Sequence, residues 1–322
     1  MSASKNGRAL KTKRAARTSS LCAAVVLLAL GASRSSAAVS GTEGASFLDI
    51  PVGGRPAALG GAYSALAEDA YAPVYNAGGL AFLSATELSG MHLDYAGSGG
   101  YEFVSAVHPL GARDGLGVAA QYFHADITNA LDANGNPIGN VSTHYGAYSL
   151  AYGHAFTEEF SLGAAVKLID AQIADVSARD AAADVGALYR VNSRLSLAAG
   201  AVNLGGRLQF LQQADTLPEN FHGGLLYKPL TALSLVAEAA YDRTGLVSGR
   251  FGAEWRPVSF IALRGGYRTE TTQQLSALAG MTTGFGLEVL GMRLDYAWVP
   301  LGDLGQTQYF SIVFAFGKKH GA

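Results

Sequence analysis

The links between the strand-like segments of this sequence alternate between short and long. From Ala85 to Phe316 the chain contains roughly fourteen segments in which apolar side chains recur at every second position. Every second link is short, as at 111–113, 157–159, 192–193, 228–230, 257–258 and 290–291, and the links between these are longer, as at 126–140, 205–218, 243–248, 269–274 and 301–306. Bacterial outer-membrane barrels have tight turns at one end, longer loops at the other and an even number of strands. The spacing therefore predicts an all-β transmembrane barrel of about fourteen antiparallel strands.

The composition agrees with a barrel whose outside faces lipid. Only 15% of the 322 residues are charged and 49% are apolar, with 41 Gly, 15 Tyr and 14 Phe. Soluble domains usually carry about 25% charged residues. The body of the chain lacks the run of about 18 apolar residues that a membrane helix needs. The net charge of −2 gives no electrostatic attraction to nucleic acid, so this class of partner is excluded.

Residues 1–38 are predicted to be a cleavable signal peptide. Basic residues from Lys5 to Arg17 precede the apolar stretch 21–30, and small residues follow at 35–38. This stretch is too short for a membrane anchor. We therefore expect export to the bacterial outer membrane, with the barrel-assembly machinery and outer-membrane lipid as partners. Cys22 is the only cysteine and lies inside the signal, so the mature chain has no disulfide.

The period of two in the best segments assigns their side chains to two faces. Phe251 and Trp255 share one face of the segment 250–256, whereas Arg250 and Glu254 share the other. A soluble antiparallel sheet would show the same pattern, but many segments reach the length of about ten residues that crosses a bilayer. We expect the apolar face to meet lipid and the charged face to line the lumen as a network of ion pairs. This network consists of Glu238, Arg250, Glu254, Arg256, Arg264, Arg268, Arg293 and Asp295.

Residues 39–83 lack the strand pattern and are predicted to form a plug inside the barrel. Small residues at 57–69 favour a short helix, and residues 72–80 are predicted to form a turn. A barrel of this size leaves room for such a segment. The predicted organisation is thus a signal peptide at 1–38, a plug at 39–83, a barrel at 84–316 and a tail at 317–322.

Several short stretches resemble PorV/PorQ-type outer-membrane proteins, which are relatives of the FadL fatty-acid channel. They are Gly44–Leu48, Gly53–Ala62, Asn76–Ala81, Leu263–Arg268 and Leu294–Ala297 with the following 300–305. The resemblance covers nearly all of the mature chain and implies a fourteen-stranded barrel with an N-terminal plug. One departure is that the family pattern Asn-Pro-Ala-Gly lacks its proline here, which makes the turn less rigid. A gating role that depends on the stiffness of this turn is therefore in doubt.

Three functions remain open at this point. In the first, a hydrophobic small molecule binds in the lumen and passes the plug. The predicted ligand-binding residues are Phe47, Leu48, Tyr63, Tyr75 and Asn76. In the second, implied by PorV of type IX secretion, the barrel docks an exported protein, for which the apolar loop at 207–211 is a candidate contact. In the third, the barrel is purely structural.

No motif in the chain indicates an enzyme, a cofactor or a metal site. The seven histidines form no two-His motif, the glycine pairs lack nucleotide-loop spacing, and no serine lies in a G-x-S-x-G setting. The loop with Asp132, Asn134 and Asn136 lacks the remaining ligands of a calcium loop. A small polar cluster of His92 and Asp94, near Glu102 and His108, is expected if these side chains face the lumen.

Overall fold

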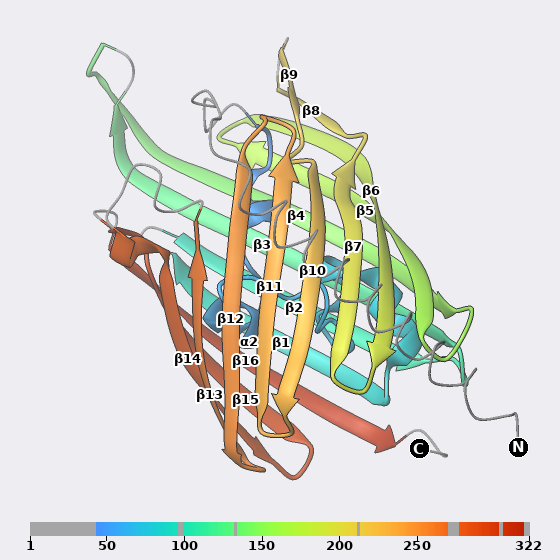
Figure 1. Cartoon of the computed structure of the whole chain (residues 1–322). Coiled ribbons are helices and arrows are strands. Elements are labelled where there is room, and N and C mark those ends of the chain that lie inside the picture. The colour runs from blue at the N-terminus through green and yellow to red at the C-terminus, as the bar shows by residue number, and fades with distance from the viewer. Residues whose placement is uncertain are drawn as a thin grey trace, which may run out of the picture. The chain divides into compact units, whose positions relative to one another are not determined.

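The computed structural model describes residues 43–95, 99–131, 134–210, 213–269, 277–302 and 305–318, so the expected signal peptide lies outside the described residues. Fourteen antiparallel strands close into a barrel in which each strand pairs with its neighbours and β1 pairs with β16 (Figure 1). The predicted antiparallel barrel is therefore confirmed. Its strands are β1 (Ala85–Tyr95), β2 (Gly99–Pro109), β3 (Asp114–Leu131), β4 (Pro137–Ala155), β5 (Phe160–Ile173), β6 (Val176–Asn192), β7 (Leu195–Leu204), β10 (Asn220–Leu230), β11 (Leu233–Asp242), β12 (Val247–Val258), β13 (Ile261–Arg268), β14 (Met281–Val289), β15 (Met292–Pro300) and β16 (Gln306–Lys318).

The two ends of the barrel differ in their connections. At one end, which we call the short-turn end, the strands are joined by the tight links 110–113, 156–159, 193–194, 231–232, 259–260 and 290–291. The opposite, long-loop end carries the connections 205–219 and 269–280, the latter including the short helix η4 (Ala277–Gly280). The tight links read from the sequence thus fall at one end of the barrel. The connections at the other end range from the two residues 174–175 to the long segments, so the expected alternation holds only in part.

The predicted long loop at 126–140 is wrong. β3 and β4 continue as a paired hairpin through Asp126↔Ser142 and on to Leu131↔Pro137, so the connection shrinks to 132–136. The ladder pairs the backbone N–H and C=O groups of both strands, which an open loop of this length would leave to water. A register shift between Ile127 and Ala130, where Asn129 has a φ of 55°, bends the hairpin.

A second, two-stranded sheet lies in the connection between β7 and β10. It consists of β8 (Arg207–Phe210) and β9 (Gln213–Thr216). Leu208 is fully buried beside Gly44, whose backbone N–H donates to the carbonyl of Thr216 at 2.9 Å. The expectation that 207–211 forms an outward apolar loop is therefore wrong for Leu208, because the hairpin turns this side chain inward.

The outer face of the barrel wall is apolar. Phe251 and Trp255 are 47% and 51% exposed, whereas Glu254 on the alternate face is 3% exposed. Exposed apolar side chains of this kind occur on all the barrel strands from β1 to β6 and from β10 to β16. They include Leu88, Val104, Val118, Leu150, Val166, Val185, Phe221, Leu235, Leu263, Phe285, Leu294 and Phe310. A continuous apolar surface of this extent is suited to lipid rather than to water. No helix in the described part of the chain has the length and apolar character needed to cross a membrane.

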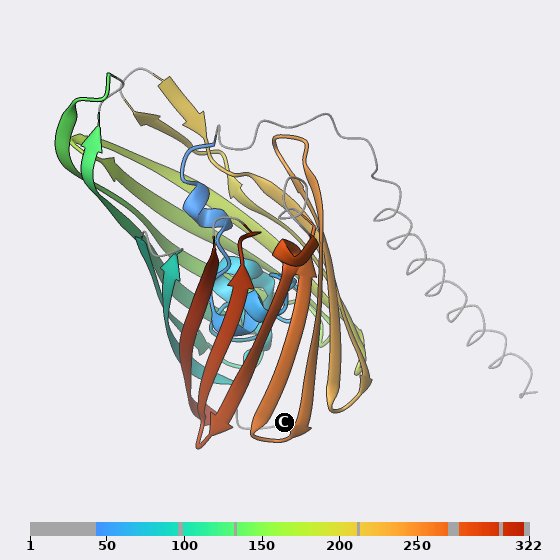
Figure 2. The same ribbon diagram turned by 90° about the vertical axis from the view of Figure 1, so that its left-hand side faces the viewer.

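An irregular N-terminal segment, residues 43–83, occupies the inside of the barrel (Figure 2). It contains η1 (Ser46–Asp49), α2 (Gly54–Ala58), α3 (Ala72–Tyr75) and η2 (Ala77–Phe82). Its hydrogen bonds reach opposite parts of the wall: the Gly54 N–H donates to Ser311 of β16 at 3.0 Å, and Ser161 of β5 donates to the Gly78 carbonyl at 2.8 Å. The segment is thus held on both sides of the lumen.

The helix in this segment is shorter and earlier than the one expected at 57–69. α2 ends at Ala58 because Gly60 and Gly61 adopt φ values of 68° and 80°, in the left-handed region where an α-helix cannot continue. The backbone that follows makes isolated turns. Side-chain composition alone had favoured helix here, but the two adjacent glycines determine where it stops.

Glycines on the inner face of the wall make room for the segment. A Cβ atom on Gly115 of β3 would lie 1.9 Å from the Leu80 carbonyl oxygen, and one on Gly163 of β5 would lie 2.2 Å from the Ala77 carbonyl carbon. No side chain fits at such distances, so the backbone of η2 lies directly on the wall. Part of the high glycine content therefore serves this close approach.

Candidate functional site in the barrel lumen

The lumen contains an aromatic cluster around Phe47 of η1. The Phe47 ring stacks on Tyr145 with centroids 5.5 Å apart and meets the edge of Tyr101 at 6.3 Å. Phe123 contacts Tyr101 and Tyr145 in turn, and Tyr95 contacts Phe123 at 5.8 Å. The members come from η1, β1, β2, β3 and β4, so strand pairing holds four of the five rings in place. We call these five residues the aromatic cluster.

The cluster is buried on one side and open on the other. Phe47 is 4% and Tyr101 is 0% exposed, whereas Tyr95, Phe123 and Tyr145 are only half-buried. The Tyr101 hydroxyl donates to the Gln121 side chain at 2.8 Å, which satisfies its one polar atom. Rings packed edge to face offer an apolar surface that an aromatic or aliphatic molecule can join without breaking hydrogen bonds.

A second feature of the lumen is a closed ring of alternating charges that ties the N-terminal segment to the wall. Going round it, each side chain contacts the next, and the last returns to the first. We call it the charge ring, and its members are Arg55, Glu254, Arg264, Asp295, Arg293 and Asp69.

The wall side of the charge ring is tightly hydrogen-bonded. Arg264 of β13 donates to Glu254 and to Asp295, both at 2.7 Å, and its side chain is fully buried. Arg293 donates to Asp295 at 2.9 Å within β15. Arg256 adds a contact to Glu254 at 3.2 Å, so this one carboxylate accepts from three guanidinium groups. Paired charges of this kind offset the cost of burying them.

The N-terminal segment contributes Arg55 and Asp69 to the charge ring. Arg55 donates twice to Glu254, at 2.8 and 3.0 Å, and Arg293 donates to Asp69 at 3.1 Å. The Tyr63 hydroxyl donates to Asp69 at 2.5 Å. Although burial by itself lowers the pKa of Arg55, Glu254 and then Tyr63 and Asp69 raise this pKa well above its usual value. Burial also raises the pKa of Tyr63, so the phenol stays protonated and remains a donor.

Two of the other predicted ligand-binding residues border a small cavity in the lumen. Leu48 and Tyr75 line a small cavity of about 70 Å³ together with His222, Glu238 and Arg250. The Tyr75 hydroxyl donates to the Val52 carbonyl at 3.1 Å. This cavity has room for little more than water, so it is no site for a hydrophobic molecule while the segment is docked.

Asn76 has a structural role in the docked segment. Its side-chain oxygen accepts from the Gly78 N–H at 3.0 Å, and its amide donates to the carbonyls of Ser64 and Ala187. These bonds cap η2 and fix it to β6. Of the five predicted ligand-binding residues, the structure brings only Phe47 into the aromatic cluster.

The predicted luminal charges lie on inner faces of the wall, and several pair across strands. Besides the charge ring, Arg250 approaches Glu238 at 3.5 Å, and Ser64 of the segment donates to the same carboxylate at 2.5 Å. Arg55 and Asp69 were not identified from the sequence. The available signal was that both are charges in a largely apolar segment, Asp69 directly after Glu68, and a charge needs a charged partner once it is buried.

At the short-turn end the lumen opens into a cavity of about 600 Å³, which we call the inner vestibule. Arg55 and Leu66 of the N-terminal segment line one side, and Glu254 and Arg256 of β12 line another. Its rim consists of turn residues and strand ends, namely Ser193, Arg194, Lys228, Pro229, Leu230 and Thr231, with Ser234 of β11.

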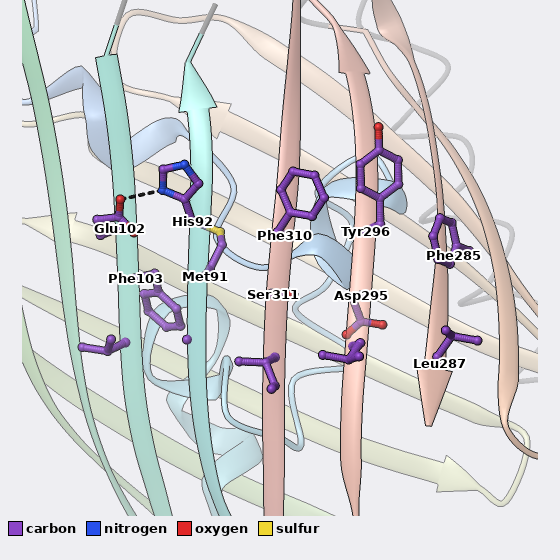
Figure 3. Close-up of a pocket in the computed structure, with 14 residues that line it drawn as sticks. Met91, His92, Glu102, Phe103, Phe285, Leu287, Asp295, Tyr296, Phe310 and Ser311 are labelled. Carbon is purple, nitrogen blue, oxygen red and sulfur yellow. Dashed lines mark hydrogen bonds and ion pairs between the residues drawn. The ribbon is translucent and has the colours of Figure 1, made fainter. Parts of the chain in front are cut away.

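His92 and Glu102, two residues of the expected polar cluster, lie on the outer face of the wall. The two side chains pair at 2.6 Å and border a groove of about 640 Å³ on the outside of β1, β2 and β14 to β16 (Figure 3). Gly90 leaves the space that Val104, Phe310 and Leu294 surround. The prediction that these polar groups face the lumen is wrong, because His92 and Glu102 share the register position of the outward Phe310. Within the described residues, no group of three or more His, Cys, Asp or Glu is placed to hold a metal ion.

Comparison with known proteins extends the description of the fold. Residues 19–170 match the model of an uncharacterised protein family, UPF0164, which is less than half of the chain. No curated protein sequence matches. Among solved structures, the CymD monoaromatic hydrocarbon channel superposes with a TM-score of 0.62 at 12% identity, covering 84% of this chain and 99% of that one. In fold, this chain resembles the FadL-like channels.

Two further structures give the same result. A FadL homologue of Pseudomonas aeruginosa has a TM-score of 0.56 at 12% identity, covering 80% of this chain and 96% of its own. The toluene transporter TodX of Pseudomonas putida has a TM-score of 0.53 at 11% identity, covering 76% and 91%. At these identities the likeness shows the fold alone. The PorV/PorQ resemblance stays a prediction.

Proposed function

We propose that this protein is a non-enzymatic outer-membrane barrel that binds a hydrophobic small molecule in its lumen and lets it cross the membrane. The observation that carries the proposal is the aromatic cluster, in which Phe47 of the N-terminal segment packs on Tyr101 and Tyr145 of the wall. The apolar outer face and the fold likeness to a monoaromatic hydrocarbon channel support the same function. The short-turn end then faces the periplasm, as in bacterial barrels.

In this proposal the N-terminal segment acts as a plug. It is bonded to the wall at Glu254 and Arg293 on one side of the lumen and at Ser161 on the other. A ligand that binds at the aromatic cluster therefore meets a closed lumen below it. Passage requires the segment to shift, and the charge ring is the contact that must open.

Docking of an exported protein, the function implied by PorV, has less support. The contact expected for it was an outward apolar loop at 207–211, and Leu208 in that loop is fully buried. Deletion of 206–213 tests this alternative directly.

Photolabelling tests the proposed binding site. The purified protein in lipid nanodiscs is exposed to a phenyl-diazirine probe, and labelled peptides are located by mass spectrometry. We expect label on the peptides with Tyr101, Phe123 and Tyr145. Phe47→Asp should lower it about tenfold, which corresponds to about 1.4 kcal/mol of binding free energy.

A matched control separates this effect from a general loss of structure. Phe260→Asp changes a half-exposed aromatic residue in the turn between β12 and β13, remote from the cluster, and should leave luminal labelling unchanged. The heat-dependent electrophoretic shift of folded barrels verifies folding of both variants. Labelling confined to the outer face in the wild type, or unaltered luminal labelling in a folded Phe47→Asp variant, would falsify the proposal.

A further inference from the structure

The inner vestibule has a strong imbalance of charge. Its lining includes four basic side chains, Arg55, Arg194, Lys228 and Arg256, and one acidic side chain, Glu254. This carboxylate already accepts hydrogen bonds from Arg55, Arg256 and the buried Arg264. It is therefore fully engaged and cannot neutralise further cations.

Two of the basic side chains have no acidic partner among the described residues. Arg194 lies in the turn between β6 and β7, and Lys228 lies near the end of β10. The backbone joins them, because the Lys228 N–H donates to the Arg194 carbonyl at 2.7 Å. Two neighbouring cations at the rim of a cavity repel each other and concentrate positive potential in it.

The remaining lining suits a compact anion. The hydroxyl-bearing residues Ser193, Thr231 and Ser234 lie along the same cavity. A guanidinium fork, an ammonium group and hydroxyls together are the donors that recognise carboxylate and phosphate oxygens. Leu66 adds one apolar contact on the side of the N-terminal segment.

We propose that the inner vestibule is a binding site for an oxyanion, a phosphate or a carboxylate, held by Arg194 and Lys228. The anion is either a free ion or the head group of an amphiphile that approaches from the short-turn end. This site is separate from the aromatic cluster, and binding there does not depend on passage of a hydrophobic molecule through the lumen.

Calorimetric titration of the purified full-length protein in nonionic detergent tests the proposal. The probes are inorganic phosphate, octanoate and the neutral octanamide, each at low and high ionic strength. We expect saturable binding of at least one anion that weakens with salt, because the rim cations are solvent-exposed. The double variant Arg194→Gln/Lys228→Gln should bind it at least tenfold more weakly.

Arg179→Gln is the matched control, since this exposed guanidinium lies on β6 but pairs with Asp170 away from the vestibule. It should leave the affinity unchanged. Octanoate binding more tightly than phosphate would support an amphiphile head group as the source, and equal binding would support a free anion. Absence of saturable anion binding, equal binding of octanamide, or unchanged affinity in a folded double variant would overturn the proposal.

Discussion

Arg55 and Glu254 are joined by two parallel hydrogen bonds, Nε to Oε2 at 2.8 Å and Nη2 to Oε1 at 3.0 Å, across 199 positions of sequence. The pair links α2 of the N-terminal segment to β12 of the wall. A bidentate contact fixes orientation as well as distance. It therefore fixes α2 against β12.

Removing the Arg55–Glu254 pair should lower the stability of the folded protein. We expect Arg55→Gln to lower the free energy of unfolding by roughly 2–3 kcal/mol, less than the 3–5 kcal/mol typical of a broken buried pair. The cost is smaller because Glu254 keeps Arg264 and Arg256. Urea titration in lipid, followed by the electrophoretic shift, measures it. Arg179→Gln, which removes an exposed pair on the outer face, should leave the free energy of unfolding nearly unchanged. Equal losses of stability for the two variants would contradict this view of the charge ring.

Removing the charge of Glu254 should cost more unfolding free energy than removing the charge of Arg55. Glu254→Gln leaves three guanidinium groups facing each other, so we expect a loss of about 3–5 kcal/mol. Glu288 is the internal control, because it also binds Arg256, at 2.9 Å, but its side chain is 48% exposed. Glu288→Gln should cost about 0–1 kcal/mol. The same urea titration applies, and a larger loss for Glu288→Gln would show that burial does not set the cost.

A side chain on the inner wall should displace the N-terminal segment. Gly163→Val would place a Cβ 2.2 Å from the Ala77 carbonyl carbon, so η2 cannot stay packed against β5. We expect protease cleavage within 43–83 while the electrophoretic shift of the barrel persists. At Gly223 the nearest atom to an added Cβ lies 3.9 Å away, so the N-terminal segment of Gly223→Val should stay resistant to the protease. Identical cleavage of both variants would argue against direct packing of η2 on the barrel wall.

The loss of stability caused by a charge on the outer face should depend on the depth of that charge in the membrane. Leu294→Arg, at the third residue of β15 on the outer face, should cost about 1–3 kcal/mol, between the costs at the interface and at the midplane, because lipid offers the guanidinium no water. Leu290, in the turn before β15, is fully exposed at 101%, and Leu290→Arg should cost about 0–1 kcal/mol. Unfolding in vesicles measures both. A harmless Leu294→Arg would mean that this face does not meet lipid.

The barrel itself was predictable because strand faces repeat at every second residue. Phe251 and Glu254 fall on opposite faces in sequence and in structure. The same periodicity could not assign His92, because the apolar stripe beside it, Met91 and Leu93, is buried inside the barrel and does not face lipid. The hairpin at 126–140 was missed since its polar residues resemble a loop, although their backbone pairs as a ladder.

The luminal site was less predictable than the wall. Phe47 was identified as an isolated aromatic residue outside the strand pattern, but its partners Tyr101 and Tyr145 are distant in sequence. Arg55 and Asp69 belong to a segment without a period, so nothing local indicates which way they point. Their partners are fixed only when the barrel closes around them, which is a property of the three-dimensional fold.

The position of the N-terminal segment has a consequence for the order of assembly. Its residues are synthesised before any strand, yet Gly54 binds Ser311, which follows 257 positions later. The seat for the segment is complete only when β16 has joined β1. The part of the barrel that is made first must therefore find its place last, and a chain that stalls before closure carries this segment loose and open to proteolysis.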